Sequence, residues 1–219
     1  MEKMNSKTNE SVEEMAHPII CIGRQLGSGG HDIGQMLARD FGATFYDREL
    51  LNLAARESGL SERLFEQNDE HKSFLRTFLH IPSALSATID YSRQGLSPDS
   101  FFLFQSDAIR KAAQQGPCVF VGRCADYVLR DFPLVTNVFI SAPLEVRINR
   151  VAQKRGISTD EACRYIEQGE RRRADYYNYY TGKTWGMAQS YDLCIDSNIL
   201  GLEATEQLIA QFIRQRLAL

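Results

Sequence analysis

Five short apolar runs separated by helical patterns constrain the fold of this 219-residue chain more than any other feature of its sequence. The runs cover residues 18–23, 43–47, 117–122, 135–141 and 191–196. Most of them are continuous rather than alternating, which is typical of parallel strands covered on both faces. Strands that alternate with helices favour right-handed crossovers and a doubly wound sheet. The sequence therefore predicts an α/β fold around a five-stranded, mainly parallel sheet.

Helix signals fill the intervals between these runs. Apolar residues recur at helical spacing after the first run and stop at Gly42. Ser158 and Glu161 form a capping box in front of a long helix. Residues 60–96 contain no strand pattern and only weak periodicity, so we interpret them as a helical insertion on one edge of the sheet. The other predicted helices are 48–58, 98–115, one opened by Pro143 and the amphipathic segment 202–217.

Composition and charge narrow the class of protein. The net charge is −3, so neither nucleic acid nor an anionic membrane is an expected partner. No apolar run reaches the roughly 18 residues of a membrane span. The five cysteines lack CxxC spacing and do not cluster with histidines, so we expect no metal site built on these cysteines. Cys21, Cys118 and Cys194 lie in apolar runs and are predicted to be buried free thiols in a reducing cytoplasm.

The chain is expected to form a single domain over residues 18–219, because no internal repeat or low-complexity linker interrupts it. Residues 1–17 are polar and lack an apolar segment of the kind found in secretory signals. We expect these residues to be a flexible N-terminus.

The stretch GRQLGSGGHDIG joins the first apolar run to the first helix. At such a turn, glycines let backbone N–H groups approach an anion, and the helix N-terminus adds its positive dipole. One interpretation is a phosphate site, and the alternative is a tight turn without a ligand. A dinucleotide site is not favoured, because the GxGxxG spacing is absent. The candidate cofactor-binding residues are Gly27, Ser28, Gly29, Gly30, His31 and Asp32.

The loop departs from the P-loop pattern at the lysine. If Gly29 is the glycine that precedes this lysine, Gly30 occupies the lysine position and Asp32 lies near the magnesium-ligand position. The later stretch TGKTWG follows a predicted helix rather than a strand, so it is not a P-loop. Arginine binds phosphate bidentately. We expect Arg24 to replace the lysine, with His31 as a weaker second candidate.

Three motifs follow one another along the chain: GRQLGSGGHDIGQMLARDFGATFYDRELL, VFVGRCADYVL and YYNYYTGKTWGMAQSYDLCIDSNILG. In this order they resemble the cytidylate kinase-like family, a divergent branch of the P-loop nucleoside monophosphate kinases. The resemblance spans roughly residues 18–217. It implies a three-layer P-loop kinase-like fold with a monophosphate-binding insertion and an arginine-bearing lid at 165–190. It also implies ATP and Mg²⁺ as cofactors and a small-molecule nucleotide as substrate.

The resemblance further implies roles for charged residues within the matched motifs. These residues are Asp47 and Arg48 in FYDRELL, Arg123 and Asp126 in VGRCAD, and Arg171, Arg172 and Arg173 in EQGERRRADYY. Together with Arg24, the candidates for catalysis are Asp47, Arg123, Arg171 and Arg172. Together with Arg147, which follows the fourth run, the candidates for substrate binding are Arg48, Asp126 and Arg173.

Structural alternatives exist for several of these residues. Arg147 and Arg150 also fit a solvated helix face, and the ERRR run fits an exposed surface. Asp47 could hold magnesium through water or be the N-cap of its helix. Asp196, which ends the last run, fits a cap or a turn better. The tyrosines of ADYYNYYTGKTWG fit packing of the lid against the insertion better than stacking on a base.

Three functions are compatible with these features. The first is a kinase that moves the γ-phosphoryl group of ATP to a nucleoside monophosphate, cytidylate-like, or to a similar small acceptor. The second is a nucleotide- or phosphate-binding protein with little or no kinase activity, which the absent lysine favours. The third is phosphoryl transfer to a non-nucleotide acceptor, as in dephospho-coenzyme A or shikimate kinases. The sequence does not decide the acceptor or the oligomeric state.

Overall fold

The computed structural model describes residues 17–48 and 98–218, which belong to two compact units. The first unit contains residues 1–47 and 116–219, and the second contains residues 48–115. In the second unit the structure describes α5 (Pro98–Gln115), which matches the helix predicted there. The predicted helix 48–58 beyond Arg48 and the predicted insertion 60–96 lie outside the described residues. The sheet and the glycine loop belong to the first unit.

A five-stranded sheet lies at the centre of the first unit. Its strands are β1 (Ile19–Arg24), β2 (Thr44–Tyr46), β3 (Cys118–Val121), β4 (Val135–Ser141) and β5 (Leu193–Asp196). The strand order is β2-β3-β1-β4-β5, and all four pairings are parallel. In the central strand, Ile20 is in register with Val119 of β3 and Thr136 of β4. Each strand coincides with one apolar run, which confirms the predicted α/β sheet.

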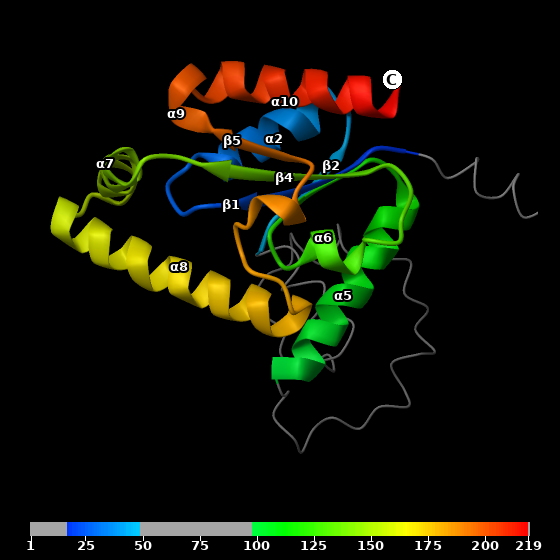
Figure 1. Cartoon of the computed structure of the whole chain (residues 1–219), viewed down its shortest axis with the longest axis horizontal. Coiled ribbons are helices and arrows are strands. Elements are labelled where there is room, and N and C mark those ends of the chain that lie inside the picture. The colour runs from blue at the N-terminus through cyan, green and yellow to red at the C-terminus, as the bar shows by residue number, and fades with distance from the viewer. Residues whose placement is uncertain (1–16, 49–97, 219) are drawn as a thin grey trace, which may run out of the picture. The chain divides into compact units, whose positions relative to one another are not determined.

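Helices cover both faces of the sheet and produce three layers (Figure 1). On one face lie α2 (Gly30–Asp40) and α10 (Leu202–Leu217), with Ile33 and Ile209 fully buried in the core. On the other face lie α6 (Ala125–Val128) and α8 (Thr159–Thr181). The helix α7 (Leu144–Arg155) packs against α8. Two short elements flank β5, namely η3 (Ala188–Ser190) and α9 (Ser197–Leu200).

Local signals in the sequence set the helix ends. Ser158 Oγ accepts a hydrogen bond from Glu161 N–H at 3.3 Å, and Ser158 N–H donates to the Glu161 carboxylate at 3.0 Å. The predicted capping box is therefore confirmed. Gly182 ends α8 with a φ of +68°, so TGKTWG terminates a helix, as its position after a predicted helix indicated. Asp196 accepts from Asn198 N–H at 2.8 Å and caps α9, also as predicted.

The prediction of buried thiols is correct for two of the three cysteines in the apolar runs. Cys21 and Cys118 are buried, whereas Cys194 is exposed. The prediction was wrong for Cys194 because its strand, β5, lies at the edge of the sheet, where one side has no neighbouring strand. An apolar run in the sequence does not distinguish a central strand from an edge strand.

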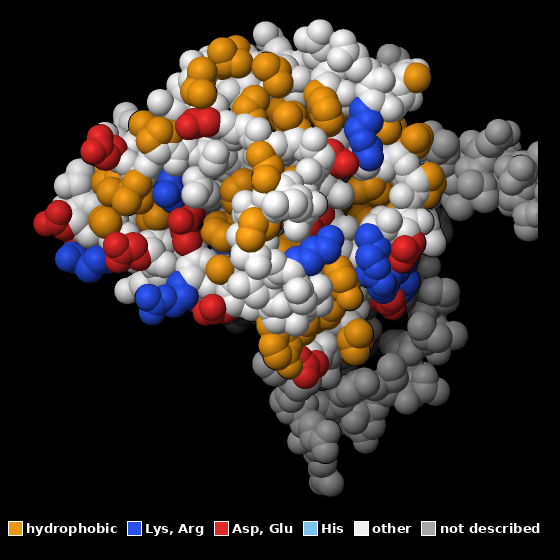
Figure 2. All heavy atoms as spheres, viewed as in Figure 1, with side chains coloured by type: hydrophobic (Ala, Val, Ile, Leu, Met, Phe, Trp, Pro, Cys, Tyr) orange, Lys and Arg blue, Asp and Glu red, His pale blue; other side chains and the backbone are white. Residues whose placement is uncertain are grey.

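Exposed apolar side chains gather on α9 and along α10. Ile199 is 77% exposed, Leu200 is 48% exposed and Leu208 is 40% exposed. Figure 2 shows hydrophobic side chains over this end of the molecule. None of the candidate site residues belongs to this patch. Among the described residues, no helix combines the length and the apolarity needed to cross a membrane.

Candidate functional site: the glycine loop and the strand ends around it

The carbonyl groups of the loop between β1 and α2 accept hydrogen bonds from side chains of α7 and α9. Arg147 Nη1 of α7 donates to Leu26 O at 3.4 Å, and Arg150 Nη1 donates to Ser28 O at 3.2 Å. Ser28 O also accepts from the Ser197 hydroxyl at 2.5 Å. In a trans peptide, the N–H group points opposite to the preceding carbonyl. The N–H groups that follow these two carbonyls therefore point away from α7.

Glycine is required at both of these N–H positions. Gly27 has a φ of +85° and Gly29 a φ of +81°, a region that other residues rarely adopt. A Cβ on Gly27 would lie 2.8 Å from the carbonyl oxygen of Arg147, and a Cβ on Gly29 would collide with Leu202. Successive N–H groups in such a turn form a concave site for an anion.

The loop leads directly into the N-terminus of α2. Gly29 is the N-cap and supplies no side-chain hydrogen bond, while the first-turn N–H groups of a helix have no partner within the helix. The N–H groups of Gly30, His31 and Asp32 therefore add donors and a positive dipole next to the loop. The local structure fits the predicted phosphate site, with the donors arranged around one end of β1.

Relative to the P-loop pattern, the cationic residue and the glycine have exchanged positions: Arg24 stands where the pattern has its first glycine, and Gly30 stands where it has lysine. In GxxxxGK, the first glycine precedes the lysine by six positions, and Arg24 precedes Gly30 by the same interval. A Cβ on Gly30 would lie 2.6 Å from Arg24 Cβ and 3.0 Å from its Cγ. A Cβ on Gly122, which follows β3, would collide with the Arg24 guanidinium. The cationic side chain thus arises from the first-glycine position and extends beside the place of the absent lysine.

Two carboxylates, a histidine and a lysine lie around the first turn of α2. His31 Nε2 is 3.4 Å from Asp47 Oδ2, and His31 Nδ1 is 3.6 Å from Asp32 Oδ1. Lys154 Nζ of α7 is 3.5 Å from the same Asp32 oxygen. Sequence reasoning missed Lys154. Its signal was the spacing of Arg147, Arg150 and Lys154, which repeats at helical intervals along one face of α7.

The segment after β3 carries Arg123 and Asp126, which follow the carboxyl end of this strand as the glycine loop follows the carboxyl end of β1. Arg123 and Cys124 have φ values of 61° and 57°, a left-handed conformation that costs roughly 1–2 kcal/mol per non-glycine residue. Strain of this kind concentrates at functional sites. The Arg123 guanidinium carbon lies 5.3 Å from the centroid of the Tyr176 ring, a distance that allows a cation–π contact.

Asp126 is held by a tyrosine from the end of α8. The Tyr177 hydroxyl donates to Asp126 Oδ2 at 2.7 Å. Burial raises the pKa of Asp126, and the hydrogen bond from Tyr177 and the positive charge of Lys183 partly offset that rise. Burial also raises the pKa of Tyr176 to about 12. These tyrosines pack against the residues after β3. The relation of the Tyr-rich segment to the predicted insertion lies outside the described residues.

The arginine cluster of α8 separates into two faces. Arg173 Nη1 donates to the Arg24 carbonyl at 3.1 Å. Arg171 and Arg172 are exposed, and at about 100° per residue neither of them lies on the side of α8 that carries Arg173. The structure does not bring Arg171 and Arg172 to the loop, so their assignment to catalysis gains no support. Arg48 is exposed and belongs to the second unit.

Arg147 is buried at the contact between α7 and the glycine loop. Its side chain is 7% exposed and lies 2.9 Å from Glu170, so it is not a solvated helix residue. Its guanidinium binds the Ala142 and Leu26 carbonyls. These contacts attach the loop to α7, and substrate binding by Arg147 stays a prediction.

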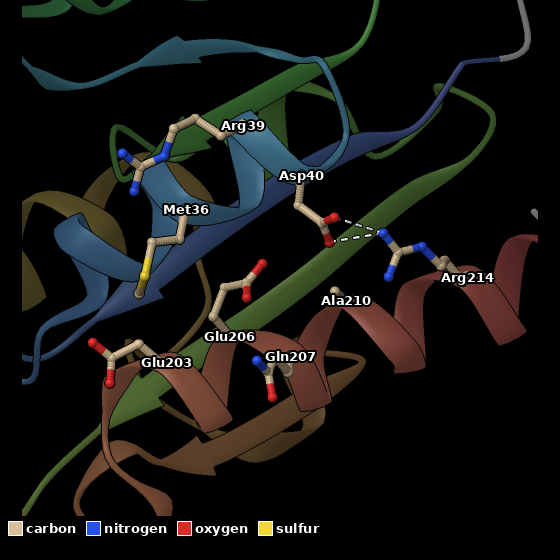
Figure 3. Close-up of a pocket in the computed structure, with 8 residues that line it drawn as sticks. All are labelled: Met36, Arg39, Asp40, Glu203, Glu206, Gln207, Ala210 and Arg214. Atoms are coloured by element: carbon tan, nitrogen blue, oxygen red, sulfur yellow. Dashed lines mark hydrogen bonds and ion pairs between the residues drawn. The ribbon is translucent and has the colours of Figure 1, made fainter.

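A hollow of about 530 Å³ lies between α2 and α10, away from the glycine loop. Figure 3 shows Glu206 directed into the space between the two helices, next to the Asp40–Arg214 ion pair. No candidate residue from the sequence lines this hollow. It is lined by Met36, Arg39, Asp40, Glu203, Glu206, Gln207, Ala210 and Arg214.

The parallel sheet and the glycine loop after its central strand define an α/β protein of the P-loop kinase type. The model of the "Cytidylate kinase-like family" matches residues 19–199. The chain belongs to this family, which confirms the predicted family and fold class.

Similar proteins agree with this assignment. A shikimate kinase from Bacteroides thetaiotaomicron has a solved structure that shares the fold, with a TM-score of 0.51, 16% identity, and coverage of 93% of this chain and 100% of that one. An uncharacterized protein from Eubacterium ventriosum ATCC 27560 has a TM-score of 0.69 at 25% identity, covering 90% of this chain and 98% of that one.

Two curated relatives are named cytidylate kinases. The protein from Methanopyrus kandleri is 33% identical over 41% of this chain and 50% of its own length. The protein from Pyrococcus horikoshii is 35% identical over 40% of this chain and 45% of its own length. The matched region spans about half the length of these relatives.

Proposed function

We propose that this chain is a small-molecule kinase that transfers the γ-phosphoryl group of ATP to a nucleoside monophosphate of the cytidylate type. The observation that carries the proposal is the loop after β1. Its carbonyls are bound by α7 and α9, the N–H groups of Gly27 and Gly29 point away from α7, and the first turn of α2 adds further N–H donors beside them. The family and the names of the curated relatives support the same class of reaction.

The chain's own residues divide the work of phosphoryl transfer. The loop N–H groups hold the phosphate oxygens, and Arg24 supplies the positive charge that a P-loop lysine would supply. Arg123 is placed at the end of β3, where an acceptor phosphate would approach in open α/β sheets. Asp126 lies at the same end and is held in one orientation by Tyr177.

The residues at the loop also fit a magnesium ion. Asp32 and Asp47 offer carboxylate oxygens beside the first turn of α2, and Mg²⁺ is usually held by one or two carboxylates together with waters and substrate phosphates. No group of three or more potential metal ligands occurs within residues 17–48 and 98–218, and a nucleotide-borne ion does not require one. When bound, the ion would neutralise charge on the phosphate oxygens.

A second function is a nucleotide- or phosphate-binding protein with little kinase activity. The specific observation in its favour is that Gly30 stands at the lysine position and has no room for a side chain. In this case the loop would bind phosphates, but Arg24 would not stabilise the transferring group. The two functions differ in turnover and not in nucleotide binding.

The test is a panel of nucleoside monophosphates and other phosphoryl acceptors with ATP and Mg²⁺, followed by ADP release. We expect acceptor-dependent ADP release with cytidylate, and a fall of about 100-fold or more in Arg24→Ala. Arg164→Ala is the matched control, because Arg164 is an exposed arginine on α8. Tight ATP binding with no turnover across the panel would reject the kinase in favour of the binding protein.

A further inference from the structure

Glu170, in the middle of α8, contacts the glycine loop through one carboxylate oxygen. Its Oε1 atom accepts a hydrogen bond from Leu26 N–H at 3.0 Å and lies 2.9 Å from Arg147 Nη1. The Glu170 side chain is 21% exposed and the Arg147 side chain is 7% exposed. Charges with so little solvent around them are weakly screened, so each depends strongly on its partner.

Arg147 links Glu170 to the peptide between Leu26 and Gly27, whose N–H group is a candidate donor to an anion. The Arg147 guanidinium donates to Ala142 O at 2.9 Å and to Leu26 O at 3.4 Å. The Leu26 carbonyl and the Gly27 N–H belong to one planar peptide. The direction of the Gly27 N–H therefore depends on Arg147, and the position of Arg147 depends on Glu170.

The neighbours of Glu170 on α8 hold the same stretch of chain. A Cβ on Gly169 would lie 2.6 Å from Leu26 Cδ1, so the Leu26 side chain packs directly against the bare α8 backbone at this position. Arg173 donates to the Arg24 carbonyl at 3.1 Å. The Leu26 side chain also packs against the apolar cluster formed by Val151, Ala162 and Ile166 between α7 and α8. One face of α8 thus contacts both the end of β1 and the glycine loop that follows it.

We propose that Glu170 is a positioning residue for anion binding, which fixes the glycine loop in the shape that directs the Gly27 and Gly29 N–H groups at a phosphate. This inference rests on the proposed function, because it takes a phosphate group as the ligand of the loop. Removal of the carboxylate leaves Leu26 N–H without its acceptor and leaves the buried Arg147 without its counter-charge. The peptide between Leu26 and Gly27 then loses its fixed orientation.

The experiment compares the wild type with Glu170→Ala, Glu170→Gln and Glu167→Gln in the full chain. Glu167 is a suitable control because it is exposed on the same helix and contacts Cys163 one turn away. Two quantities are measured for each protein. The first is the Kd for Mg²⁺-ATP and for tripolyphosphate by calorimetry. The second is amide hydrogen exchange of peptides covering residues 24–32 and 135–141.

We expect Glu170→Ala to raise both Kd values by about 10-fold or more, as for the loss of a hydrogen bond to a charged group. Exchange should accelerate in residues 24–32 and stay unchanged in residues 135–141. Glu170→Gln should lie between Glu170→Ala and the wild type, because glutamine keeps an acceptor oxygen without the charge. Glu167→Gln should match the wild type in both measurements.

Three results would overturn the inference. The first is a wild-type Kd in Glu170→Ala. The second is equal acceleration of exchange in both peptides, which would assign Glu170 to the stability of the whole fold. The third is a wild type that binds neither ATP nor tripolyphosphate, which would refute the proposed function as well. The first two results, in contrast, would refute only the role of Glu170. If Glu170→Ala does not fold, the nearly isosteric Glu170→Gln decides the matter by the same criteria.

Discussion

Replacing Gly30 by lysine should destabilise the fold, because the Arg24 side chain already occupies the space that the new side chain needs. The added Cβ would lie 2.6 Å from Arg24 Cβ and 3.0 Å from Arg24 Cγ, whereas carbon atoms in contact prefer about 3.5–4.0 Å. These two atoms form the backbone-proximal part of the arginine and cannot move far. Overpacking of this kind costs roughly 1–3 kcal/mol, and the gain from removing a helical glycine offsets up to about 1 kcal/mol. We expect a net loss of roughly 1–2 kcal/mol.

The second half of the prediction concerns Gly30→Lys combined with Arg24→Gly. Arg24→Gly removes the obstacle, so the double variant restores the ordinary order of glycine and lysine in the motif. We expect the two changes to be coupled by about 1–2 kcal/mol in a double-mutant cycle. Urea and thermal unfolding measure the cycle, since 1 kcal/mol corresponds to roughly 2–4 °C in Tm for a chain of this size.

The control is Gly116→Ala, because no described atom lies within 4 Å of the Cβ position at Gly116. This change should alter the free energy of unfolding by no more than about 0.5 kcal/mol. Wild-type stability in Gly30→Lys, or strictly additive energies in the cycle, would refute the view that Arg24 fills the lysine's place. A parallel measurement of ATP affinity then tests whether lysine at position 30 can replace the charge of Arg24.

Two further predictions concern local interactions. Ser158→Ala should lower the free energy of unfolding by about 1 kcal/mol, because it removes the hydroxyl that accepts from Glu161 N–H; thermal unfolding beside the wild type measures this loss, and an unchanged Tm would contradict it. Burial raises the pKa of Asp126 in the folded state. Between the pKa of the unfolded chain and that of the folded chain, the folded chain therefore binds more protons. The stability that Asp126 contributes falls as the pH rises through this range. Asp126→Asn should remove this part of the slope when unfolding is measured from about pH 4 to about pH 7, and an identical slope would argue against it.

The strands and most helix ends were predictable because their causes are local. A continuous apolar run of four to seven residues is what a strand covered on both faces requires. The capping box at Ser158 and the left-handed glycine at position 182 act on their own helix. Cys194 shows the limit of this reasoning, because burial at the edge of a sheet depends on the order of the strands and not on the run itself.

The candidate site was predictable at the ends of strands and less so on the helices. Arg24 was selected as a replacement for the P-loop lysine, and Asp47 and Arg123 were selected from the family resemblance. All three follow or end strands, which agrees with the rule that ligands bind beyond the carboxyl ends of parallel strands. Arg171 and Arg172 were selected because EQGERRRADYY resembles the lid of the family, and a resemblance in sequence does not show which residues of a helix face the loop. The contact of Arg173 with Arg24 depends on how α8 lies against β1.

The sequence by itself determined the parallel sheet, its flanking helices and a glycine loop at the end of the first strand, because periodicity, caps and glycine positions act over a few residues. Only the tertiary structure decided how the loop is held. Glu170 is 144 positions from Leu26 in the chain, yet its carboxylate accepts the Leu26 N–H. The sequence indicated Arg24 as the replacement for the missing lysine, but only the packing shows that the Arg24 side chain leaves no room for a Cβ on Gly30. Contacts of this kind depend on packing between elements, which no local pattern encodes.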